Sequence, residues 1–93
     1  MLETLFSPKK IGNVEIPNRL IRSATFTNTA SPNGTPSDLS IEFYSELAKG
    51  GIGLIITGMT SIDKPGRFSK GQLCFFDDAQ IAGHKKMTDA IHE

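Results

Sequence analysis

Apolar and polar residues along the chain predict a strand, a helix and a second strand, in that order. Residues 20–23 have an apolar centre without helical spacing, which favours a strand. Residues 37–49 repeat apolar positions with helical spacing, whereas residues 53–57 form the uninterrupted apolar run of a strand buried on both faces of a parallel sheet. Such a βαβ unit is almost always right-handed. The apolar face of the predicted helix carries Ile41, Tyr44, Leu47 and Ala48.

Local signals at both ends support the central helix. Thr35 can serve as its N-cap, Pro36 suits the first helical position, and Asp38 can close a capping box. Gly50 and Gly51 follow the last apolar position, and glycine readily adopts the left-handed conformation that ends a helix. The central helix is therefore bounded on both sides.

Elements on either side extend the pattern. Residues 5–16 contain short apolar runs around Gly12-Asn13, a pair that suits the turn of a small hairpin. Residues 25–35 and 58–76 are rich in turn-forming residues and are predicted to be long loops. Asp77 begins a second predicted helix, with Gln80 placed to complete a capping box. The residues expected to face the interior from this helix are Ile81, Met87 and Ile91.

Composition excludes several classes of function. The chain has 93 residues, with 10 Lys and Arg against 10 Asp and Glu, so no long-range field favours nucleic acid or an anionic membrane. The apolar runs fall far short of the ~20 residues that span a bilayer, and no secretory signal pattern is present, so the cytoplasm is the expected compartment. A single cysteine excludes an internal disulfide and a thiolate zinc cluster.

Three features suggest chemistry but favour structural roles. The glycines of residues 50–53 precede a strand, whereas a dinucleotide-binding fingerprint follows a strand and opens a helix, so a helix stop is the better interpretation. His84 and His92 have no third ligand at a useful spacing, which favours packing or solvated roles over a metal site. Cys74, beside Phe75, is expected to pack under a loop rather than act as a reactive thiol.

Residues 23–26 and 57–60 stand at the predicted carboxyl ends of the two strands. In barrels and open α/β sheets, these ends carry the functional loops. Small residues at positions 23–25 would also let a flat ring approach the backbone. Alternatively, both segments are plain strand ends, and the local pattern does not separate the two interpretations.

Several segments match, in order and spacing, the start of a known enzyme family. They are Leu5-Phe6-Ser7-Pro8, Ile16-Pro17-Asn18-Arg19-Leu20, Arg22-Ser23-Ala24-Thr25, residues 51–58, Gly66-Arg67 and the helix capped by Asp77. Together they resemble the Old Yellow Enzyme family of FMN-dependent NAD(P)H:flavin oxidoreductases and ene-reductases. The resemblance implies an α/β fold that is the N-terminal part of a TIM (β/α)8 barrel, with about two βα units after a small hairpin.

The same resemblance assigns residues to the cofactor and the substrate. Phe26 stands where many members have a Thr or Cys that bonds to the flavin and tunes its potential, so that bond is not expected here. Asn28 stands where some members place a Tyr near the substrate, which implies a substrate contact. Tyr44 is not that residue, and no catalytic residue is assigned. The residues implied to contact FMN are Ser23, Ala24, Thr25, Phe26, Gly58 and Met59.

A complete barrel needs ~250 residues, or about 31 for each unit, so residues 1–93 correspond to one partial domain with two strands and their helices. The family's phosphate-binding loops and proton donor lie outside this segment. The implied activity, hydride transfer from NADH or NADPH through FMN to a small-molecule electron acceptor, therefore belongs to an intact barrel, and the chain alone is expected to be inactive. The alternatives are a truncated non-catalytic remnant, or a module that binds partners or self-associates through its open sheet edge.

Overall fold

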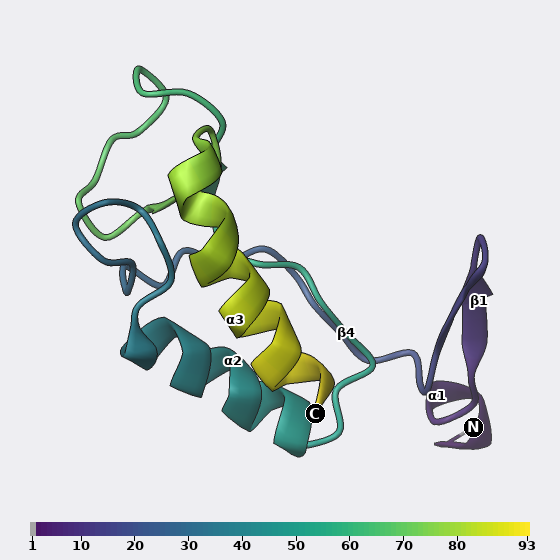
Figure 1. Ribbon diagram of the computed structural model, residues 1–93. Coiled ribbons are helices and arrows are strands. Elements are labelled where there is room, and N and C mark those ends of the chain that lie inside the picture. Colours follow the sequence, from purple (N-terminus) through teal and green to yellow (C-terminus); the bar gives the residue numbers. More distant parts are fainter. Residues whose placement is uncertain (1) are drawn as a thin grey trace.

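Strands β3 (Ile21–Arg22) and β4 (Leu54–Ile55) lie side by side at the centre of the structure, and helix α2 (Asp38–Lys49) connects them (Figure 1). The two strands are parallel, and their register pairs Ile21 with Leu54. The βαβ unit predicted from the apolar pattern is therefore confirmed.

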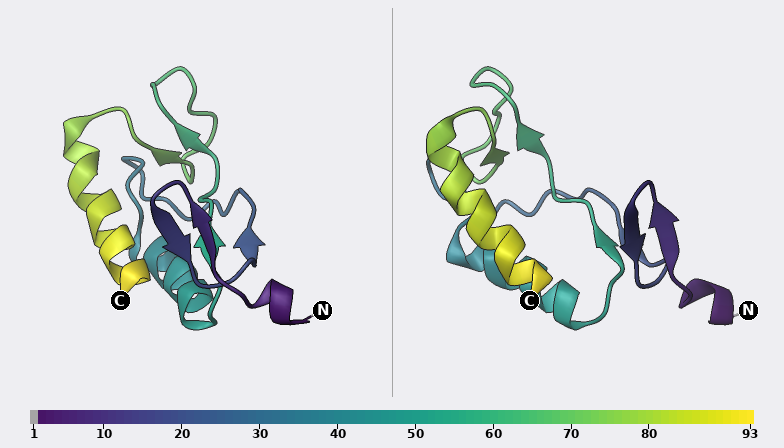
Figure 2. Two further views of the ribbon diagram at one scale, coloured as in Figure 1. Left: turned by 90° about the vertical axis from the view of Figure 1, so that its right-hand side faces the viewer. Right: turned by 45° about the vertical axis from the view of Figure 1, so that its right-hand side comes forward.

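The computed structural model describes residues 2–93, and its elements extend in two directions from this unit. The N-terminal hairpin lies at the opposite end from the loop of residues 61–76 (Figures 1 and 2), and the molecule measures 44 × 23 × 21 Å. Every helix within the described residues is too short or too polar to cross a membrane. The other elements are α1 (Leu2–Leu5), β1 (Lys9–Ile11), β2 (Val14–Ile16), β5 (Thr60–Ser61), β6 (Leu73–Cys74), the 3-10 helix η1 (Asp78–Gln80) and α3 (Ile81–His92).

The hairpin is confirmed, whereas two smaller features were not predicted. Strands β1 and β2 are antiparallel around Gly12, whose φ of 60° places it in the left-handed region that favours glycine. Strands β5 and β6 form a parallel pair inside the segment predicted as a loop. Each of these strands has two residues, which is too short for an alternating pattern to mark. Helix α1 has four residues, which is too few for a helical repeat to mark it.

Helix α2 begins at a different cap from the predicted one. Ser37 is the N-cap, and its Oγ accepts the amide hydrogen of Ser40 at 3.1 Å. Thr35 instead donates its amide and hydroxyl hydrogens to Asn33 Oδ1, and Pro36 belongs to an isolated β-bridge before the helix. These contacts hold the preceding residues in a turn. The predicted capping box at Thr35, with Pro36 in the first helical position, is therefore wrong.

Two other helix boundaries follow the prediction. The amide of Gly50 donates to the Glu46 carbonyl at 3.0 Å, and Gly51 has a φ of 95°, so the glycine pair ends α2. Asp77 and Gln80 form a capping box before α3, although the first turn is the 3-10 helix η1. Both signals depend on residues close in sequence.

The buried face of α3 differs in part from the prediction. Met87 is buried, Ile91 is half-buried, and Ile81 is 49% exposed, so its predicted inward orientation is wrong. The face that packs inward is set by Gln80 and His84, which are both buried. Gln80 is held by the capping box, and this fixes the rotation of the following helix.

The core is small and is formed by residues of α2, α3, β2 and β6 rather than of β4. Leu54 and Ile55 are half-buried, and Ile56 is 49% exposed, so the prediction of a strand buried on both faces is wrong. The sheet has two strands, so neither β3 nor β4 has a second neighbouring strand within residues 2–93. The buried apolar residues are Ile16, Tyr44, Leu73, Cys74 and Met87.

Candidate functional site

The segments that follow β3 and β4 meet at Gly58. A Cβ atom on Gly58 would lie 2.5 Å from the carbonyl oxygen of Thr25 and 3.3 Å from the Cα of Phe26. Gly58 is buried, and its φ lies outside the left-handed region, so this position needs glycine for space rather than for conformation. The structure thus brings together the two segments that were predicted to form a site, residues 23–26 and 58–59.

The hydrogen-bond ladder between β3 and β4 stops one rung before Gly58. The amide of Leu54 donates to the Leu20 carbonyl at 3.3 Å, and the amide of Ile56 donates to the carbonyl of Arg22 at 3.0 Å. The next rung would join the amide of Gly58 to the carbonyl of residue 24. Instead, this amide donates to the hydroxyl oxygen of a buried tyrosine in α2, Tyr44, at 2.9 Å. The sequence suggested only a core role for Tyr44, and no local signal marked this contact.

Ala24 therefore has a free backbone edge. Among residues 2–93, no group accepts the amide hydrogen of Ala24 or donates to its carbonyl oxygen. Ser23, Ala24 and Thr25 are all exposed, and the Thr25 hydroxyl donates to the Ser23 carbonyl at 3.2 Å. The result is an exposed stretch with small side chains, in which the backbone amide and carbonyl of Ala24 are unpaired.

Phe26 lies at the edge of this stretch. Its side chain is 38% exposed, and its ring centroid lies 5.5 Å from that of Phe68, with the ring planes at 44°. Phe68 comes from the long loop after β5, and no local sequence signal marks it. The pair places an apolar surface beside the unpaired backbone.

The remaining predicted residues, Met59 and Asn28, occupy different environments. Met59 follows Gly58 and is 52% exposed. Asn28 has a φ of 55°, and its Oδ1 accepts a hydrogen bond from the Ser69 hydroxyl at 3.3 Å. Within the described residues the side-chain amide nitrogen of Asn28 donates to no acceptor, so this donor remains available.

A chain of hydroxyl groups ties the loop after β3 to the start of α2. Thr29 Oγ1 lies 2.9 Å from Thr27 Oγ1 and 2.7 Å from Ser40 Oγ. Ser40 Oγ also donates to the Thr29 carbonyl at 2.9 Å, and the Ser37 hydroxyl donates to the same oxygen. The loop that carries Asn28 is therefore anchored to a helix.

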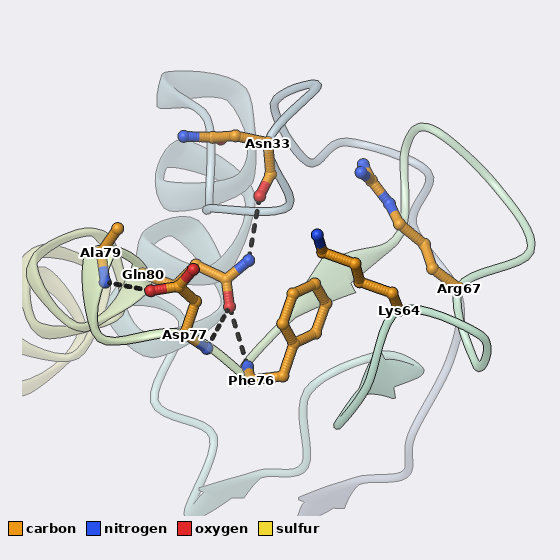
Figure 3. A pocket seen from close by; sticks show the side chains of 7 residues that line it. All are labelled: Asn33, Lys64, Arg67, Phe76, Asp77, Ala79 and Gln80. Atoms are coloured by element: carbon orange, nitrogen blue, oxygen red, sulfur yellow. Dashed lines mark hydrogen bonds between the residues drawn. The ribbon is translucent and has the colours of Figure 1, made fainter.

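A separate cavity of about 340 Å³ opens beside the long loop and η1 (Figure 3). The side chain of Gln80 lines this cavity and connects two of its segments. Its Nε2 donates to the Asn33 carbonyl at 3.0 Å, and its Oε1 accepts from the amides of Phe76 and Asp77. The guanidinium of Arg67 donates to loop carbonyl groups. The polar groups here are largely occupied by the fold itself. The lining residues are Asn33, Lys64, Arg67, Phe76, Asp77, Ala79 and Gln80.

The cysteine and the buried histidine have the structural roles that the sequence favours. Cys74 is fully buried. His84 Nε2 lies 2.8 Å from the Cys74 carbonyl oxygen, and its ring stacks on Phe75 with centroids 4.3 Å apart. No group of three or more potential metal ligands occurs within residues 2–93.

Comparison with known proteins identifies the family of this chain. A sequence model of the NADH:flavin oxidoreductase / NADH oxidase family matches residues 4–93. The chain belongs to this family. The resemblance predicted from the sequence is thereby confirmed.

Two curated relatives illustrate the match. The chain is 38% identical over 89 residues to the NADH oxidase of Thermoanaerobacter brockii, covering 95% of this chain and 14% of the relative. It is also 38% identical over 90 residues to a metal reductase of Desulforamulus reducens, covering 97% of this chain and 13% of the relative. The chain thus spans a small part of the length of these relatives.

Solved structures support the same family assignment. A 2-naphthoyl-CoA reductase superposes with a TM-score of 0.92 at 34% identity, covering 99% of this chain and 14% of the other. An Old Yellow Enzyme from Pichia sp. AKU4542 gives a TM-score of 0.88 at 27% identity, covering 96% of this chain and 23% of the other. The fold is the N-terminal part of a TIM (β/α)8 barrel, as predicted.

Proposed function

We propose that this chain forms one wall of the FMN site in an NAD(P)H-dependent flavin oxidoreductase of the ene-reductase type. One observation carries the proposal: the unpaired, exposed backbone of Ala24 at the carboxyl end of β3, between small neighbours. In a TIM barrel, this end of the strands faces the active site. Family membership supports a flavin as the ligand.

The residues fit a flat ring with a polar edge. The free amide and carbonyl of Ala24 offer one donor and one acceptor, and the small side chains at Ser23 and Thr25 leave room for the ring. Gly58 lets the second segment close against the first without a side chain between them. Phe26 has no polar group, so it bounds the site through its ring rather than through a hydrogen bond. Met59 and Gly58 flank the ring on the β4 side.

When FMN is bound, it supplies hydride transfer between NADH or NADPH and a small-molecule electron acceptor. The side-chain oxygen of Asn28 accepts a hydrogen bond from Ser69, and we propose that its amide nitrogen donates a hydrogen bond to the small-molecule electron acceptor. The relatives include proteins named NADH oxidase, metal reductase and NADPH dehydrogenase, which favours a small acceptor without selecting one. We place the reaction in the cytoplasm, where both nicotinamides are abundant.

A chimera tests the proposal. In it, this chain replaces the matching segment of the Thermoanaerobacter brockii NADH oxidase, and the parent oxidase serves as the positive control. We expect the chimera to retain flavin after desalting, measured by its visible absorbance. Retention by the parent but not by a chimera with native helix content would refute the proposed function.

Two substitutions in the chimera sharpen the test. Ala24→Trp places a bulky side chain where the ring approaches the backbone, so bound flavin should fall about tenfold or more, equivalent to at least ~1.4 kcal/mol. Ala82→Trp, on the exposed surface of α3, is the matched control and should retain flavin. Phe26→Thr adds a hydroxyl and should leave flavin bound while shifting its reduction potential.

A further inference from the structure

The carbonyl oxygen of Ala24 is free because another acceptor has taken the amide hydrogen that would pair with it. Two rungs of the ladder, at Leu54 and Ile56, follow the regular parallel spacing. Continued by two residues on each strand, the same spacing gives a bond from the Gly58 amide to the Ala24 carbonyl. The hydroxyl of Tyr44 accepts this amide hydrogen instead, at 2.9 Å.

Tyr44 is held in place from several sides. Its residue is fully buried, and its ring packs edge-to-face on Phe43, with centroids 5.4 Å apart and planes at 77°. The guanidinium carbon of Arg22 lies 5.7 Å from the centre of the Tyr44 ring and 5.0 Å from that of Phe43. A side chain this constrained holds its hydroxyl at a fixed position. Helix α2 therefore determines where the hydrogen-bond ladder between β3 and β4 ends.

We propose that Tyr44 is a positioning residue for the flavin wall. Its hydroxyl diverts the Gly58 amide from the sheet and so leaves the Ala24 carbonyl unpaired for the ligand. The same bond holds Gly58 against the Thr25 carbonyl, where a Cβ would lie 2.5 Å away. This inference rests on the proposed function, and it adds a residue that lies behind the site and does not touch the flavin.

The substitution that isolates this role is Tyr44→Phe, which removes only the hydroxyl. The buried amide of Gly58 then loses its hydrogen-bond partner. Hydrogen exchange of the Gly58 amide, followed by mass spectrometry in the chimera, should therefore accelerate about tenfold. Leu39→Ala is the matched control, because it truncates an exposed side chain of the same helix and leaves the Tyr44 hydroxyl and the rings around it in place. It should not change exchange at Gly58.

The flavin provides the second readout. In Tyr44→Phe, we expect the dissociation constant for FMN to rise about tenfold, equivalent to ~1.4 kcal/mol. At saturating FMN, the visible circular dichroism of the bound flavin should also change, which a purely structural loss of stability would not produce. Leu39→Ala should leave both properties as they are in the unsubstituted chimera.

The outcomes separate the two proposals. Unchanged Gly58 exchange, or FMN affinity within twofold of the unsubstituted chimera, would overturn the role of Tyr44 while leaving the proposed function intact. Failure of the unsubstituted chimera to bind FMN would instead refute the proposed function, and the flavin role of Tyr44 with it. Faster exchange at Gly58 together with weaker, spectrally altered flavin binding would support the positioning role.

Discussion

Gly58→Ala should destabilise the chain although it adds only one methyl group. The new Cβ would lie 2.5 Å from the Thr25 carbonyl oxygen, which belongs to the backbone and cannot move aside as a flexible side chain can. Relieving the overlap requires the two segments to separate by about half an ångström. Such overpacking costs about 1–3 kcal/mol, and reduced freedom of the unfolded chain returns about 0.4–1 kcal/mol. The expected net loss in the free energy of unfolding is about 1–2 kcal/mol.

Urea unfolding followed by circular dichroism measures this loss, with sucrose added to raise the starting stability. A chain of this size has a urea slope of ~1 kcal/mol per molar, so the midpoint should fall by about 1–2 M. Gly50→Ala is the matched control: its φ is −71°, and the nearest atom to its new Cβ is 3.4 Å away. Equal midpoints for the two variants would refute the claim that space selects glycine at position 58.

Three further predictions concern the chain by itself. Ser37→Ala removes the observed N-cap of α2 and should lower stability by about 1 kcal/mol, whereas Thr35→Ala, at the wrongly predicted cap, should cost less; thermal unfolding compares them. The isolated chain should self-associate, because its surface of 6341 Å² and radius of gyration of 14.4 Å exceed the ~5,300 Å² and ~12 Å expected for a compact monomer. Sedimentation velocity measures this, and a clean monomer with a sharp unfolding transition would contradict it. The isolated chain should also not retain FMN after desalting, since it supplies one wall of the site; stoichiometric flavin that NADH bleaches would show that the chain suffices.

The sequence predicts the parts of this structure that depend on neighbours along the chain. Asp77 and Gln80 lie three residues apart, and their capping box forms as expected. The prediction of Thr35 as the N-cap of α2 is wrong because the choice of cap does not depend on near neighbours alone. Several residues near it can cap a helix, and the choice of Ser37 depends on an isolated bridge from Pro36 to Ala30 that the local pattern does not contain. Local signals locate a helix more reliably than they choose between adjacent caps.

Part of the candidate site could likewise be predicted from the sequence, and part of it could not. Segments 23–26 and 58–59 could be selected because they follow two strands whose carboxyl ends must share one edge of a parallel sheet. The bond between Tyr44 and Gly58 joins residues 14 positions apart, and a tyrosine on an apolar helix face is indistinguishable from an ordinary core residue. The contact between Phe26 and Phe68 crosses a loop with no regular period. Tertiary packing alone creates these contacts.

Two features near strands β3 and β4 have a common physical origin. The apolar side chain of Ile56 is 49% exposed in a run with the composition of a fully buried strand. The Nη1 atom of Arg22 is buried without a hydrogen-bond partner among the described residues, and leaving such a donor unpaired costs about 1–3 kcal/mol. Arg22 belongs to β3 and Ile56 directly follows β4, and the sheet here consists of these two strands. A barrel adds strands on both sides of this pair and packs its interior. The sequence of these strands is therefore suited to a more complete sheet than the one that residues 2–93 form.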